Sequence, residues 1–114
     1  MPVSTLGGLL AFGVLFSVFN ALFEEVFFRG ILFDAIESQW GVWIAVVVSA
    51  FLFGCGHMHG YPSGILGSAL AGIYGLCLGW LRVFSGGIGF PVVAHIVADA
   101  TILTIVARST VVSS

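Results

Sequence analysis

The sequence predicts an all-α fold: a polytopic transmembrane helix bundle of about four spans that encloses a buried polar cavity. Sixty percent of the 114 residues are hydrophobic and only 7% are charged, whereas a soluble domain carries roughly a quarter charged residues. The chain is long enough for about four apolar spans of ~20 residues each. We therefore expect a single domain, residues 1–114, that is integral to a membrane and crosses it several times.

Two apolar stretches make up the first half of the chain. The first runs from Leu6 to about Phe33, which is too long for one straight span at about 1.5 Å per residue. Its early glycines suggest a loose or bent start, and the polar segment DAIESQW closes it. These glycines are Gly7, Gly8 and Gly13. The second stretch runs from Val42 to about His57 and ends where HGYPSG brings two glycines and a proline close together.

The second half contains two further apolar stretches. The third, Ile65 to Leu81, carries small residues at four-residue spacing, which lets helix backbones approach closely in a bilayer. The two ladders are Gly64, Ser68, Gly72 and Ala71, Gly75, Gly79. We expect this helix to pack centrally. The segment RVFSGGIGFP then interrupts the chain, and Pro91 suits the start of a fourth helix from about Val92 to Ala107.

The composition argues against a strongly charged partner. A formal net charge of −2 gives no reason to expect nucleic acid. Cys55 and Cys77 lie in apolar runs, where a free thiol behaves as a small hydrophobe. No basic segment precedes the first apolar stretch, so we interpret it as a span rather than a signal peptide. Three arginines are the only cations, too few for the positive-inside rule to assign an orientation.

Ionisable residues within spans are costly in lipid and mark functional sites, and this chain has three clusters of them. In the first, Glu25 and Arg29 are four residues apart and share a helix face, which predicts a structural ion pair. Glu24 points about 100° away and is free to face a different environment. The alternative is a helix that surfaces at this point, but apolar residues continue on both sides.

The other two clusters contain the histidines. His57 and His59 are two residues apart and do not share a helix face, so we expect one of them in a common site. His59 precedes a glycine and a proline, as a loop residue would, which leaves His57 as the candidate. His95 and Asp99 share a face at a spacing that lets a carboxylate orient an imidazole. The alternative for His57 is a hydrogen bond between helices without catalysis, and for His95 and Asp99 it is helix capping or a polar contact between helices.

Because isolated ionisable groups are costly in lipid, we expect Glu24, His57, His95 and Asp99 to converge. The first three could hold a catalytic Zn²⁺, which lowers the pKa of bound water to about 7. Alternatively, Glu24 could act as a general base with His95 without a metal, while His57 and a protonated Asp99 stabilise an oxyanion. Both routes lead to hydrolysis of an amide bond.

The three clusters also resemble, in order, the motifs of a known family. EEVFFRG resembles the EExxxR motif of the CPBP intramembrane proteases, which include CAAX prenyl proteases and bacteriocin-processing, Abi-type enzymes. FGCGH, from Phe53 to His57, resembles the FxxxH motif of that family. HIVAD, from His95 to Asp99, resembles its HxxxN/D motif. The motifs cover most of the chain, from about residue 20 to residue 105.

The resemblance implies a membrane-embedded hydrolase, an intramembrane endopeptidase of a type commonly labelled a metalloprotease. It implies that Glu24 and His95 activate water, while His57 and Asp99 support the oxyanion. Glu25 and Arg29 would be structural or assist Glu24. A Zn²⁺ cofactor and a metal-free glutamate mechanism are the rival expectations. The implied partners are a peptide or membrane-protein substrate and the lipid bilayer.

Two features depart from the family pattern. Asp99 stands where the prenyl-processing members typically have Asn, and a negative Asp would oppose an oxyanion. The chain is also shorter than many members, so additional helices or subunits are candidate partners. A non-catalytic proton or cation relay, or a membrane scaffold, is the alternative function.

In a strict up-and-down bundle His57 would end the second span and His95 would begin the fourth, on opposite sides of the membrane. Convergence therefore requires helices that tilt, break or start deep in the membrane, and we expect a non-ideal bundle with a catalytic cavity. A protease would gather Glu24, His57 and His95 around one water-accessible point. A relay would string them along the membrane normal.

Overall fold

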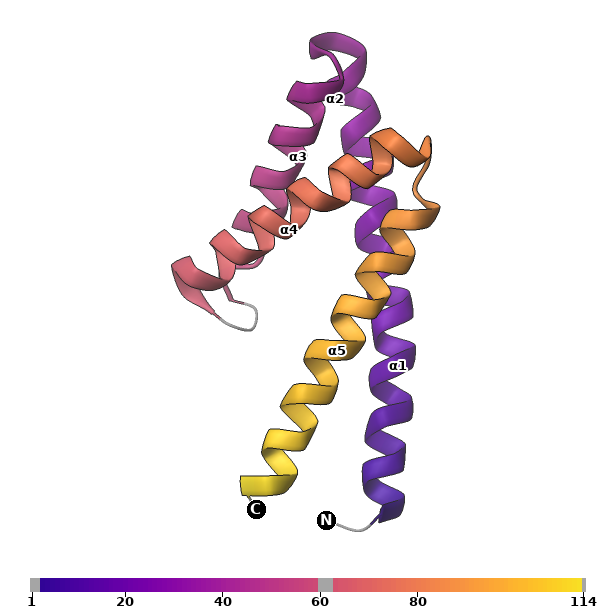
Figure 1. Ribbon diagram of the computed structural model, residues 1–114, viewed down its shortest axis with the longest axis vertical. Helices are drawn as coiled ribbons and strands as arrows, with labels where there is room; N and C mark the ends of the chain where they lie inside the picture. Colours follow the sequence, from indigo (N-terminus) through magenta and orange to yellow (C-terminus); the bar gives the residue numbers. More distant parts are fainter. Residues whose placement is uncertain (1–2, 60–62, 114) are drawn as a thin grey trace.

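The computed structural model describes residues 3–59 and 63–113, and within these ranges all regular secondary structure is helical (Figure 1). The elements in chain order are α1 (Val3–Glu25), the π-helical segment η1 (Val26–Leu32), α2 (Phe33–Trp40), α3 (Val42–Cys55), α4 (Gly64–Ser85) and α5 (Gly89–Ser113). The predicted all-α class is confirmed. Pro91 is the third residue of α5, as its position in the sequence suggested.

Among the described residues, three helices are long and apolar enough to cross a membrane: Thr5–Trp40, Gly64–Ser85 and Gly89–Ser109. The first joins α1, η1 and α2 into 36 residues, about 54 Å of helix against ~30 Å of hydrocarbon. The remaining predicted span is the shorter apolar helix α3, which has 14 residues. The protein is a multi-pass integral membrane protein.

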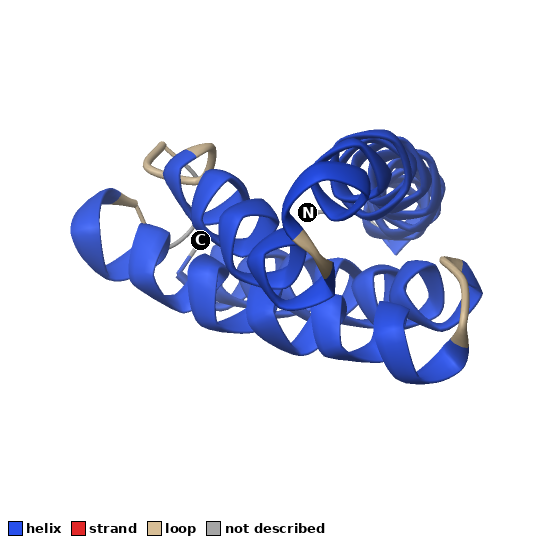
Figure 2. Ribbon diagram, turned by 90° about the horizontal axis from the view of Figure 1, so that it is seen from above, coloured by secondary structure: helices blue, strands red, loops and turns tan. Residues whose placement is uncertain are grey.

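The helices form two pairs that are inclined to one another. Helices α1 and α5 lie side by side and antiparallel, with both chain ends at the same end of the molecule (Figure 1). Helices α3 and α4 form the second pair, which leans away from the first. Seen along the long axis, the N-terminal helix is almost end-on and other helices cross the view (Figure 2). Both α3 and α4 contact η1, so the charged part of the long helix lies where the pairs meet.

The small residues of α4 allow the close contact with α3 that their spacing predicted. A Cβ built on Gly54 of α3 would lie 2.8 Å from the Ser68 carbonyl oxygen and 3.0 Å from the Gly72 Cα. A Cβ on Gly75 would lie 3.1 Å from the Ala50 Cα. The Ser68 hydroxyl also donates a hydrogen bond to the Gly54 carbonyl at 2.8 Å. Backbone therefore packs on backbone along this pair, and α4 is central as expected.

The irregularity in the long helix lies later than the glycines suggested. Helix α1 is α-helical from Val3 through Glu25, so the predicted loose or bent start at Gly7 and Gly8 was wrong. The helix instead widens to π geometry at Val26–Leu32, directly after the glutamates. Such segments leave backbone groups without their usual partner and often accompany functional sites. Here the Arg29 carbonyl accepts a hydrogen bond from Arg82 Nε of α4 at 3.1 Å.

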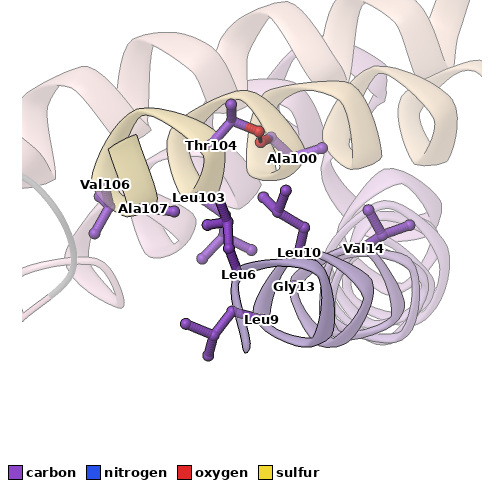
Figure 3. A pocket seen from close by; sticks show the side chains of 10 residues that line it. All are labelled: Leu6, Leu9, Leu10, Gly13, Val14, Ala100, Leu103, Thr104, Val106 and Ala107. Carbon is purple, nitrogen blue, oxygen red and sulfur yellow. Dashed lines mark hydrogen bonds between the residues drawn. The ribbon is translucent and has the colours of Figure 1, made fainter. Parts of the chain in front are cut away.

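An apolar pocket of about 220 Å³ lies between the N-terminal half of α1 and the C-terminal half of α5 (Figure 3). Its described lining is aliphatic or glycine apart from Thr104, whose hydroxyl donates to the Ala100 carbonyl within its own helix. None of these described side chains is an acid or a base, and the Thr104 hydroxyl has no neighbouring base that could activate it as a nucleophile. The pocket offers apolar contact only.

Candidate active site

The Glu25–Arg29 pair is fully buried at the junction of α1, η1 and α4. Arg29 Nη1 lies 3.1 Å from Glu25 Oε2, and both side chains are 0% exposed. Arg29 Nη2 donates to the Gly75 carbonyl of α4 at 2.8 Å. The guanidinium also lies over the Phe53 ring, 4.6 Å from its centroid. The predicted ion pair is confirmed, and glycine at position 75 leaves room for Arg29 Nη2, which would be 3.1 Å from a Cβ there.

Glu25 has a second partner that sequence spacing alone did not indicate. His95 Nδ1 of α5 lies 2.7 Å from Glu25 Oε2, in a buried contact between residues 70 positions apart. Because Glu25 is ion-paired with Arg29, it accepts the hydrogen bond and His95 Nδ1 carries the proton. This leaves His95 Nε2 facing the site. A carboxylate that orients an imidazole in this way fixes both its tautomer and its rotation.

Glu24 faces the opposite nitrogen of the same imidazole. Its Oε2 lies 3.5 Å from His95 Nε2 and 3.7 Å from His57 Nε2. This oxygen is buried and accepts no hydrogen bond from any described residue. Such an atom requires an explanation, since buried polar atoms are nearly always satisfied. The two adjacent glutamates thus contact opposite edges of His95, and the ring links them.

His57 follows the end of α3 and is held by the helix that precedes it. Its Nδ1 lies 2.6 Å from the Phe53 carbonyl oxygen, which can only accept, so Nδ1 carries the proton and Nε2 faces Glu24. The His57 and Phe53 rings are 4.3 Å apart between centroids, and the Phe53 ring meets His95 edge-on at 5.6 Å. The spacing of Phe53 and His57 therefore has a structural reason. His59 lies in the turn after α3, as predicted.

Asp99 completes the cluster from the next turn of α5. Its Oδ1 lies 3.5 Å from His95 Nε2, as the four-residue spacing predicted. Its Oδ2 accepts a hydrogen bond from Asn20 Nδ2 of α1 at 2.9 Å. Asn20 was not among the residues predicted from the sequence to form the site. The available signal was a lone amide in an apolar helix, four residues before Glu24 and hence on the same face.

A cavity of about 490 Å³ opens beside this cluster between α4 and α5. Its polar lining side chains are those of His57, Tyr74, His95, Asp99 and Thr101, and the rest of the lining is apolar or glycine: Phe53, Gly67, Leu70, Ala71, Ala98 and Ile102. The Tyr74 hydroxyl donates to the Ala94 carbonyl at 2.7 Å. A cavity is therefore present, but its lining is mainly apolar where a polar one was predicted. Its apolar side chains lie next to His57 and His95, the two histidines that contact Glu24.

The inclined helices explain how side chains from three elements meet. Helix α3 is short, and His57 lies two residues beyond it, while His95 lies in the seventh position of α5. The distances from Glu24 Oε2 to both histidines are below 4 Å. The four predicted residues therefore surround one region and do not form a row along a helix.

One carboxylate and two imidazole nitrogens are chemically suited to Zn²⁺. Glu24, His57 and His95 are the residues that would hold such an ion, since Glu24 Oε2 lies 3.7 Å from His57 Nε2 and 3.5 Å from His95 Nε2. Among residues 3–59 and 63–113 no ready-made group of three or more metal ligands is found.

A carboxylate and two oriented histidines thus meet beside a mainly apolar cavity, within or directly after apolar helices. The chain matches the family model described as Type II CAAX prenyl endopeptidase Rce1-like over residues 6–101. The matched region covers most of the chain, and the protein belongs to this family of integral membrane CAAX-type proteases. Comparisons with curated proteins and with solved structures give no significant match.

Proposed function

We propose that this protein is an intramembrane endopeptidase in which Glu24 and His95 activate the attacking water. The observation that carries the proposal is the buried Glu24 Oε2, which accepts no hydrogen bond from any described residue and lies 3.5 Å and 3.7 Å from two histidine nitrogens. These separations exceed a direct hydrogen bond, so this oxygen is left to accept one from a water molecule beside the histidines. Family membership supports endopeptidase activity in general.

In the proposed reaction Glu24 is the general base. It removes a proton from water as the water oxygen bonds to the peptide carbonyl carbon, and the carbonyl π electrons move to the carbonyl oxygen. The resulting tetrahedral intermediate then collapses and breaks its C–N bond. Glu24 returns the proton to the leaving nitrogen, which departs as an amine. Atoms and charge balance without any further reactant.

His95 and Glu25 keep the water in place. The bond from His95 Nδ1 to Glu25 holds the ring so that Nε2 faces both Glu24 and Asp99, each at 3.5 Å. Arg29 neutralises Glu25, which otherwise would be a second uncompensated carboxylate in the site. The roles expected for Glu25 and Arg29 are thus orientation of His95 and charge balance.

His57 and Asp99 are the proposed groups that support the oxyanion, and each can do so in one protonation state only. His57 Nδ1 is engaged with the Phe53 carbonyl, so Nε2 donates to an oxyanion only when the ring is cationic. Asp99 Oδ2 already accepts from Asn20, so a donated proton has to reside on Oδ1. Charge that develops in the transition state is stabilised best by donors held in place beforehand.

We propose a mechanism that needs no metal, because a carboxylate next to a water molecule can act as the base by itself. Zinc bound by Glu24, His57 and His95 is the rival, and it would activate the same water as a Lewis acid. Chelation separates the two mechanisms. A strong chelator should leave cleavage by the purified protein unchanged, with less than one equivalent of zinc bound.

The substrate proposed is a peptide segment with apolar side chains, which the cavity of about 490 Å³ between α4 and α5 can accept. The name of the family model adds the CAAX prenyl tail as the first substrate to test. Protein reconstituted in lipid vesicles should be given internally quenched peptides with prenylated and unprenylated CAAX ends. Product masses then locate the cleaved bond. Absence of products from every peptide, with folded protein, would count against endopeptidase activity.

A further inference from the structure

We propose that Asn20 is a positioning residue that fixes Asp99, and through it the face of His95 that meets Glu24. The inference rests on the proposed function, since it concerns the same site. It begins from the hydrogen bond between Asn20 Nδ2 and Asp99 Oδ2 at 2.9 Å, which joins residues 79 positions apart.

A second side-chain hydrogen bond joins the same pair of helices. It runs from His95 Nδ1 to Glu25 Oε2 at 2.7 Å. Helices α1 and α5 are antiparallel (Figure 1), so residue 20 of α1 pairs with residue 99 of α5, and residue 25, further along α1, pairs with the earlier residue 95. Glu24 lies on α1 between the two ties. The two hydrogen bonds therefore fix the position and rotation of α1, which carries Glu24, relative to α5, which carries His95.

The Asn20 tie also selects which oxygen of Asp99 enters the site. With Oδ2 held by the amide, Oδ1 is the oxygen that lies 3.5 Å from His95 Nε2. Without Asn20, the carboxyl group can rotate and either oxygen, or neither, can face the ring. Terminal carboxyl torsions are broad, so an external hydrogen bond is what restricts them. Asn20 does not line the cavity beside the site, so its loss should affect turnover more than substrate binding.

A reciprocal exchange tests this role. Asn20→Ala should lower kcat about tenfold with KM unchanged, the usual scale for groups that orient a catalytic side chain. Asn20→Asp places two carboxylates next to each other and should lower kcat further than Asn20→Ala does. The double variant Asn20→Asp with Asp99→Asn restores an amide–carboxylate bond with its sides exchanged, and should recover the free energy of unfolding that Asn20→Asp loses; kcat is not its readout, because Asp99 belongs to the proposed oxyanion site. Ser17→Ala is the matched control, because the Ser17 hydroxyl donates only within α1, to Gly13.

A second measurement does not depend on activity. In protein labelled with ¹⁵N-histidine, Asn20→Ala should shift the His95 Nε2 resonance, whereas Ser17→Ala should not. In an Asp99→Ala background the Asn20 substitution should leave that resonance unmoved. If the wild type cleaves no peptide but these shifts appear, the proposed function fails and the positioning role stands. Unchanged kcat and an unchanged His95 resonance in Asn20→Ala would overturn it, as would an exchange no more stable than Asn20→Asp.

Discussion

Glu25 Oε2 and His95 Nδ1 lie 2.7 Å apart in the buried centre of the molecule, although 70 positions separate the two residues in the chain. The same carboxylate oxygen pairs with Arg29 at 3.1 Å. One atom thus anchors the helix that carries the proposed base, the helix that carries its histidine partner, and the guanidinium that reaches α4. The stability of the fold and the geometry of the site depend on the same contact.

Glu25→Gln should destabilise the protein strongly. It leaves the buried Arg29 without a counter-charge, and breaking one side of a buried pair costs about 3–5 kcal/mol. The measurement is the free energy of unfolding in mixed micelles. Asp34→Asn is the control, because its carboxylate, 63% exposed, meets Arg82 at 3.0 Å and exposed pairs contribute ~1 kcal/mol or less. Equal losses in the two variants would show that the buried pair has no special role.

Glycine is required at position 54 and not at position 72, although both face the same helix contact. A Cβ on Gly54 would lie 2.8 Å from a backbone oxygen of α4, whereas a Cβ on Gly72 would have ordinary contacts at 3.9 Å. Gly54→Ala should therefore separate α3 from α4 and cost about 1–3 kcal/mol, as overpacking does. Gly72→Ala should be close to neutral. Thermal unfolding of both variants in one detergent tests this, and the reverse order would contradict the packing described.

Much of the α3–α4 contact could be predicted from sequence because helical spacing is local information. The ladder of small residues, the Glu25–Arg29 pair and the His95–Asp99 pair all follow from the positions of residues along one helix. The helix ends were less accurate: α4 continues to Ser85 where the sequence suggested Leu81. Composition alone does not fix such ends.

The contacts between different helices could not be predicted from the sequence. The contacts from Glu25 to His95 and from Asn20 to Asp99 depend on how far each helix is rotated about its axis, which local spacing does not determine. The π-helical segment Val26–Leu32 changes that rotation directly after the glutamates. The sequence placed the irregularity of the long helix at its early glycines instead, because glycine is the familiar cause of a bend.

Arg82 should be irreplaceable by lysine. Its Nε donates to the Arg29 carbonyl in η1 while an Nη nitrogen donates to Asp34 at 3.0 Å. A lysine is a single point charge and cannot reproduce this forked geometry. We expect Arg82→Lys and Arg82→Gln to lower the unfolding temperature by similar amounts. Full retention of stability in Arg82→Lys would mean that charge near Asp34 suffices and that the carbonyl contact is incidental.

The two neighbouring histidines should differ sharply in their effect on turnover. His57 faces Glu24, whereas His59 is exposed in the turn after α3. Loss of one oxyanion donor costs about 10²–10³-fold in kcat, so His57→Ala should lose that much and His59→Ala little. Steady-state cleavage of a quenched peptide by each variant in lipid is the measurement. A larger loss for His59→Ala would place the site elsewhere.

The most direct test is the comparison of wild type with Glu24→Gln, each reconstituted in lipid and shown to be folded. Glutamine keeps the shape of the side chain but cannot accept a proton from water. The proposed mechanism predicts that cleavage of a quenched CAAX peptide falls by at least about 10²-fold, the contribution of a general base. Glu37→Gln, which changes an exposed glutamate of α2, should retain wild-type turnover. Equal cleavage by wild type and Glu24→Gln would contradict the role of Glu24.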